Sequence, residues 1–147
     1  MSTNTLQKDN LLRGGQFLVK ETKCEDIFTL EDLSEEQKMM RDSTKEFVDR
    51  ELWAHWERFE KKDYAYTAET MRKAGDLGLL GIAVPEAYGG MGMGFVSTML
   101  VCDYISGATG SFSTAFGAHT GIGTMPITLY GNEEQKMKYV PKLATGE

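Results

Sequence analysis

The chain has 147 residues, 41% of them hydrophobic and 26% charged, which are the proportions of one soluble globular domain with its own core. Its net charge of −6, with basic and acidic residues interspersed, leaves no basic stripe and argues against a nucleic-acid binder. The two cysteines, Cys24 and Cys102, are too few for a disulfide framework and wrongly spaced for a zinc site, and no apolar run reaches the roughly 18 residues of a transmembrane segment.

Residues 1–33 are polar, contain Gly14-Gly15, and predict an extended N-terminal arm. The first ten residues show no charged segment followed by an apolar stretch, so we expect no secretory signal and a cytoplasmic location. We expect residues 34–147 to form one helical domain.

The first helix of that domain is predicted from a capping box. Ser34 is followed three residues later by Gln37, with acidic residues between them in the first turn. Apolar residues then recur at helical spacing and predict one buried face. They are Met40, Phe47, Val48, Leu52, Trp56 and Phe59.

A second helix is expected from Thr67, with Met71, Ala74 and Leu77 pointing inward. Gly78 is suited to end it. The next residues, 79–94, read LLGIAVPEAYGGMGMG, and their glycine and proline content predicts a loop.

Residues 95–105 are apolar nearly all round, which favours a helix buried inside a bundle over a surface helix. A buried strand is the alternative, because several of these residues are β-branched, but the length of the segment favours the helix. The fold class we predict is therefore all-α, a helical bundle of about five to six helices with an extended N-terminal arm.

Two features of the C-terminal part also predict helices. Pro126 suits the first turn of a short helix that Gly131 ends. Asn132 and Gln135 form a second capping box, opening a helix that we expect to stop near Pro141.

The residues alone offer little catalytic chemistry. His55 and His119 lie far apart, without a second ligand at helical spacing, and for His119 a hydrogen-bonded structural role is favoured over a functional one. The glycines at 89–94 fit no phosphate-binding register. We expect no catalytic, cofactor-binding or metal-binding residue in this chain. Residues 107–124, built from small side chains, could host an apolar ligand.

Four segments resemble the acyl-CoA dehydrogenase family. Residues 77–90 (LGLLGIAVPEAYGG) are similar to the family loop LGLLG-x-x-x-PExYGG, and residues 110–119 to its next helix region. Residues 131–147 (GNEEQKMKYVPKLATGE) are similar to GTEEQK-x-x-YLP-x-LA-x-GE, with Asn132 and Val140 as small departures. Residues 14–18 resemble the long, very-long-chain-type bacterial members.

The resemblance implies a three-part oxidoreductase of fatty acid β-oxidation, with an N-terminal helical domain, a middle β-domain and a C-terminal helical bundle. It further implies FAD held mainly by the last two parts and by a neighbouring subunit, a glutamate of the C-terminal domain that removes the α-proton of an acyl-CoA thioester, and hydride transfer from the β-carbon to the flavin. Electron-transfer flavoprotein would be the redox partner and a homo-oligomer the assembly. We expect the present residues alone to be inactive and not to bind FAD.

By the same resemblance, this domain forms one wall of the acyl-tail pocket. The residues expected there are Ser113, Thr114, Phe116, Gly117, Ala118, Thr120 and Gly121. Their small volume predicts a deep pocket and a preference for acyl chains of about 12 carbons or more. Two alternatives stay open. For the small residues, the alternative is that they allow two helices to pack closely. For the function, the alternative is a stand-alone helical lipid-binding or interaction module.

Overall fold

The computed structural model describes residue 12 and residues 14–147. These residues form seven α-helical segments and no strand, so the all-α prediction is confirmed for the described chain. The segments are α1 (Glu35–Phe47), α2 (Trp56–Glu60), α3 (Tyr64–Asp76), α4 (Phe95–Ser106), α5 (Gly110–Gly117), α6 (Met125–Tyr130) and α7 (Glu133–Thr145). The chain divides into two compact units, residues 1–38 and 39–147.

Within residues 1–38, the part of the predicted arm that the structure describes contains three short 3-10 helices. They are η1 (Gly14–Leu18), η2 (Cys24–Asp26) and η3 (Leu30–Asp32). The first turn of η3 is held by Asp32, whose carboxylate accepts from the backbone N–H of Thr29 at 3.0 Å. Residues 1–11 and 13 of the arm lie outside the described residues.

The capping box predicted at Ser34 is present. The N–H of Ser34 donates to Oε1 of Gln37 at 3.0 Å, and the N–H of Gln37 donates to Oγ of Ser34 at 3.2 Å. After α1 the helical path continues through the π-helical segment η4 (Val48–Leu52) and the 3-10 turn η5 (Trp53–His55) into α2. The predicted buried face is correct except at Trp56, which is 49% exposed, because this change of helix type rotates the later residues.

Helix α3 begins three residues earlier than predicted, at Tyr64. Asp63 caps it by accepting from the N–H of Tyr66 at 3.0 Å. The helix ends at Asp76, and Gly78, two residues on, has the left-handed φ of +76° expected of a glycine that stops a helix. The prediction that Leu77 points inward is wrong. Its side chain is 43% exposed because it follows the last helical residue, whereas Ala74 is fully buried.

The loop at 79–94 contributes core residues although loops usually run over the surface. Leu79, Leu80, Ile82 and Val84 are each at most 3% exposed. Backbone bonds hold the loop against itself: the N–H of Met93 donates to the Ile82 carbonyl at 2.8 Å. This packing places the loop beside α4 and the α5–α6 helix.

The segment at 95–105 is a helix, α4, so the strand alternative is excluded. Its expected burial on all sides is wrong. Val101 and Ile105 are 1% exposed, but Phe95 is 75% exposed, Val96 44% and Met99 42%. One side of α4 packs on the core and the other side meets solvent.

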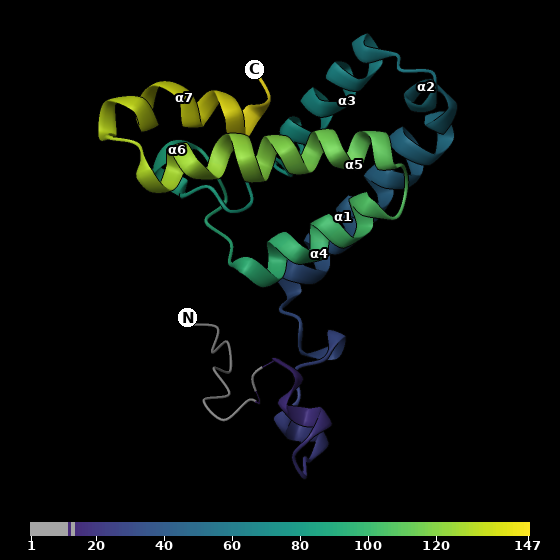
Figure 1. Cartoon of the computed structure of the whole chain (residues 1–147), viewed down its shortest axis with the longest axis vertical. Helices are drawn as coiled ribbons and strands as arrows, with labels where there is room; N and C mark the ends of the chain where they lie inside the picture. Colours follow the sequence, from purple (N-terminus) through teal and green to yellow (C-terminus); the bar gives the residue numbers. More distant parts are fainter. Residues whose placement is uncertain (1–11, 13) are drawn as a thin grey trace. The chain divides into compact units, whose positions relative to one another are not determined.

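Residues 110–130 form one continuous helical run, in which the π-helical segment η7 (Ala118–Thr124) joins α5 to α6. In Figure 1 this run is drawn as one unbroken helix, with α7 folded back along it. Pro126 is the second residue of α6, in the first turn after the wide π segment η7 ends, and Gly131 ends α6 as predicted.

Helix α7 opens with the predicted capping box, in which Asn132 and Gln135 exchange two bonds of 2.9 Å. The prediction that it stops near Pro141 is wrong, because Pro141 lies inside a helix that continues to Thr145. Val140 and Ala144, one turn apart, are buried against Val84. That burial holds the helix together across the hydrogen bond that proline removes.

Candidate functional site: an apolar pocket beside the α5–α6 helix

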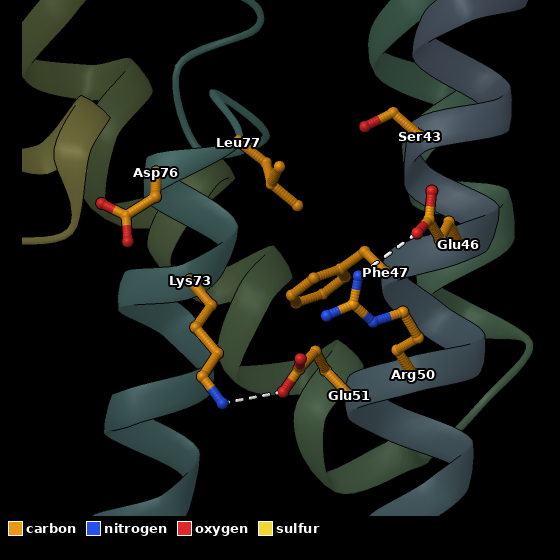
Figure 2. A pocket seen from close by; sticks show the side chains of 8 residues that line it. All are labelled: Ser43, Glu46, Phe47, Arg50, Glu51, Lys73, Asp76 and Leu77. Carbon is orange, nitrogen blue, oxygen red and sulfur yellow. Dashed lines mark hydrogen bonds and ion pairs between the residues drawn. The ribbon is translucent and has the colours of Figure 1, made fainter.

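Two of the cavities in residues 39–147 have linings that differ in chemistry. The larger is a groove of about 390 Å³ between α1–η4 and α3, lined by polar and charged side chains around Phe47 and Leu77. Figure 2 shows Lys73 directed toward Glu51 and Arg50 directed toward Glu46, while Asp76 points away from these pairs. Lys73 forms ion pairs with Glu51 at 2.8 Å and Glu69 at 3.1 Å, and Arg50 pairs with Glu46 at 3.2 Å.

These pairs occupy the cations that an acidic ligand of the groove would need. The hydrogen bonds from Lys73 to Glu51 and then to Glu69 raise the pKa of Lys73 to about 12, so the side chain stays protonated and paired with these carboxylates at neutral pH. Both cations of the groove are therefore already paired with carboxylates of the same surface.

The smaller cavity, of about 270 Å³, is the apolar pocket. Its walls are loop residues 79–84, α4 and part of the α5–η7–α6 run. None of its lining side chains carries a charge; the polar ones are Thr98, Thr120 and Cys102. The pocket is thus built for a ligand without charge or hydrogen-bonding groups.

The polar atoms of the lining are already satisfied or weakly polar. Oγ1 of Thr120 donates to the Phe116 carbonyl at 2.9 Å, and Oγ1 of Thr98 to the Gly94 carbonyl at 3.4 Å. Burial raises the pKa of the Cys102 thiol, which keeps it neutral at physiological pH. A hydrocarbon inside the pocket would leave no buried polar group newly unpaired.

Four of the seven residues expected at the acyl-tail wall line this pocket. They are Phe116, Gly117, Thr120 and Gly121. A Cβ added at Gly117 or at Gly121 would meet nothing within 4 Å, so among the described residues these two glycines serve no close helix contact.

The other three expected residues do not line it. Oγ of Ser113 donates to the Gly110 carbonyl at 3.2 Å, and Thr114 and Ala118 are exposed on other faces of the helix. The loop and α4 residues of the pocket, Met99 and Cys102 among them, were missed by sequence reasoning. The apolar character of residues 79–84 and 95–105 was the available signal.

The glycines at 89–94 are not a phosphate cradle. The backbone N–H groups of Gly89, Gly90, Met91, Gly92 and Met93 all donate to carbonyl oxygens of residues 81–86. A cradle needs free N–H groups that converge on the anion. This loop therefore offers no site for the diphosphate of a dinucleotide.

The two histidines have structural surroundings. The His55 ring packs edge-on against Tyr66 at 5.4 Å between centroids. Nε2 of His119 donates to the Leu143 carbonyl at 2.8 Å, as the expected hydrogen-bonded role requires. In residues 12 and 14–147, no three His, Cys, Asp or Glu side chains gather as a metal site needs. None of the helices in that part of the chain has the length together with the hydropathy of a membrane span.

Comparisons with known proteins identify the family. The model for the N-terminal domain of acyl-CoA dehydrogenases matches residues 34–147. A probable acyl-CoA dehydrogenase of Bacillus subtilis is 42% identical over 135 residues, 92% of this chain and 23% of its own. The mitochondrial isovaleryl-CoA dehydrogenase of Bos taurus is 37% identical over 78% of this chain and 27% of its own.

A solved structure gives the same result. The acyl-CoA dehydrogenase of Bacillus anthracis, complexed with FAD, superposes with a TM-score of 0.80 at 47% identity, covering 90% of this chain and 23% of that one. The chain thus spans about a quarter of the length of the relatives it matches. The chain belongs to the acyl-CoA dehydrogenase family, and its residues 34–147 correspond to the family's N-terminal domain.

Proposed function

We propose that this chain provides one wall of the acyl-tail pocket of an FAD-dependent acyl-CoA dehydrogenase, which forms the α,β double bond of fatty acyl-CoA thioesters. The observation that carries the proposal is the apolar pocket, whose lining has no charge and whose hydroxyl groups are bonded to the backbone. A fatty-acyl tail gains roughly 0.8 kcal/mol for each methylene that it buries in such a place. The role of these residues is to bind and orient the tail.

FAD, when bound, would accept the β-hydrogen as hydride, but we assign its main contacts to residues outside this chain. The backbone N–H groups of residues 89–93 already donate to carbonyl oxygens of the same loop, so this glycine loop is unsuited to bind the FAD diphosphate. Electron-transfer flavoprotein as the redox partner and the cytoplasmic location belong to the same proposal. Both stay predictions.

The pocket volume supports a long acyl chain. An apolar cavity of about 150 Å³ takes up benzene, so a cavity near 270 Å³ holds on the order of ten carbon atoms. Together with the thioester end, this corresponds to the expected preference for about 12 carbons or more. Family membership does not set this length, because one relative is named for isovaleryl-CoA.

The two cysteines provide the test of tail binding. Cys102 lines the pocket, whereas Cys24 is exposed in the unit of residues 1–38. Modification by a small thiol reagent is followed by mass spectrometry with increasing dodecanoyl-CoA. We expect protection of Cys102 with no change at Cys24. Equal modification of Cys102 with and without dodecanoyl-CoA would contradict the proposal.

A second copy of the chain is the partner we propose for the exposed apolar side chains. Phe95 is 75% exposed, Ile122 81% and Tyr130 86%. Exposed apolar surface of this kind favours association. Sedimentation over a range of concentrations should show oligomers that grow with concentration, and a strict monomer at high concentration would contradict this part.

The alternative, a stand-alone lipid-binding module, predicts a different ligand preference. In such a module, free dodecanoic acid would protect Cys102 as well as dodecanoyl-CoA does, and the module would take no part in dehydrogenation. Continuation of the reading frame beyond Glu147 into a β-domain would exclude it.

A further inference from the structure

Both walls of the apolar pocket rest on the last turn of α7. On the loop side, a Cβ added at Gly81 would lie 3.2 Å from Cβ of Ala144. A Cβ added at Gly146 would lie 3.1 Å from Cδ1 of Leu80, which lines the pocket. The loop therefore has no free space between itself and α7, and its position follows that of the helix end.

On the other wall, the contact is the hydrogen bond of His119. A carbonyl oxygen only accepts, so Nε2 of His119 carries the proton that binds the Leu143 oxygen at 2.8 Å. This carbonyl is one of the last four of α7, which lack a partner four residues on. The N–H that would serve it, from Glu147, donates to Lys142 instead, at 3.0 Å. His119 supplies the missing donor.

The same residue also lies at the start of the π turn that shapes the pocket wall. The carbonyl of His119 accepts from Oγ1 of Thr124, five residues on, at 2.8 Å. Its neighbours along the helix, Gly117 and Gly121, line the pocket. Moving His119 would therefore move the wall.

We propose that His119 is a positioning residue, which fixes the π-helical wall to the last turn of α7 and so sets the width of the apolar pocket. This rests on the proposed acyl-tail function. The last turn of α7 contacts both the loop at 79–84 and the π-helical segment at 118–124. A change in either contact should therefore alter the position of both pocket walls.

The test compares His119→Phe, which keeps a ring and loses the donor, with His119→Gln, whose amide can still donate. Thr128→Val is the matched control, because Oγ1 of Thr128 donates to the Thr124 carbonyl at 2.9 Å, a bond within the helical run that does not join it to α7. Two quantities are measured on the full chain. They are amide hydrogen exchange at 79–84 and 118–124, and the dodecanoyl-CoA concentration that half-protects Cys102.

For His119→Phe we expect faster exchange at both segments and a half-protecting concentration raised about 3- to 10-fold, the range that loss of one such hydrogen bond gives. His119→Gln should restore part of both effects, and Thr128→Val should change neither the exchange at 79–84 nor the protection. Faster exchange confined to 118–124, or unchanged protection, would overturn the inference.

Ala144→Gly tests the same support from the other wall and serves if His119→Phe does not fold. It opens space against Gly81 and leaves His119 intact. Faster exchange must then spread from 79–84 to 118–124, and its confinement to 79–84 would overturn the inference. The two proposals fail separately: a wild-type chain whose Cys102 is never protected refutes tail binding, while the exchange results still decide on His119.

Discussion

Two helical glycines of this domain have opposite surroundings. Gly75, in α3, is buried where α3 meets the end of α7, and a Cβ there would collide with the backbone carbonyl of Thr145. Gly117, at the end of α5, lines the apolar pocket, and a Cβ there would meet nothing within 4 Å. One glycine allows two helices to approach closely, and the other leaves space that the described chain does not fill.

The comparison separates the two explanations of small residues that the sequence left open. Close packing explains Gly75, because α3 and α7 could not reach their present separation with a side chain between them. It does not explain Gly117 or Gly121. Empty space at these two glycines is what a wall facing a ligand, or facing another protein surface, would need.

The largest expected effect on stability comes from replacing Gly75 and Gly117, one at a time, with alanine. Gly75→Ala should lower the free energy of unfolding by about 1–3 kcal/mol, because the end of α7 must move away. Gly117→Ala should raise it by about 0.5–1 kcal/mol, since alanine is the better helix former and meets no neighbour. Denaturant unfolding of both variants checks this. Equal signs for the two changes would remove the distinction.

The second prediction concerns a larger side chain placed in the open space at Gly121. In the full-length enzyme, Gly121→Leu should shift the chain-length profile of kcat/KM toward shorter acyl-CoAs, measured from C4 to C18. Each methylene displaced costs about 0.8 kcal/mol, or about fourfold. Gly110→Leu is the control, because Gly110 is also in open space but does not line the pocket. A folded Gly121→Leu enzyme with the wild-type profile, or a wild-type optimum at C4–C8, would contradict the proposal.

Local signals in the sequence predicted the helix starts well. Both capping boxes formed as expected, because their bonds join residues three apart and need no tertiary context. Gly78 and Gly131 ended their helices for equally local reasons. Four of the seven expected wall residues line the pocket because helical spacing carries one face of residues 110–130 toward the loop.

The remaining features of the fold and of the pocket depend on tertiary packing or on changes of helix type, and a local sequence pattern shows neither. Pro141 remains within α7 because Val140 and Ala144 are buried on either side of it. Trp56 is exposed although the helical pattern predicts it to be buried, because the π and 3-10 turns before it change the direction in which it points. The loop and α4 walls of the pocket could not be assigned, because they adjoin the helix only in the folded chain.

The smallest expected effect concerns the ion pairs of Lys73 on the polar side of α3, one of which joins α3 to Glu51 of η4. The raised pKa of Lys73, about 12 against roughly 10.4 in an unfolded chain, means that its pairs stabilise the fold fully below pH 10.4. That contribution is lost as the pH rises through about 12. Because the side chain is 38% exposed, solvent screening limits it to at most about 1 kcal/mol.

Lys73→Met should therefore reduce the free energy of unfolding slightly at pH 8, and the difference from wild type should shrink at pH 11.5 to 12. Lys73→Arg is the control, because arginine keeps its charge across this range and should preserve the pairs with Glu51 and Glu69. Comparing variants at each pH cancels the titration of most other groups. A loss of several kcal/mol at pH 8 would mean that the groove, and not the close approach at Gly75, holds α3 in place.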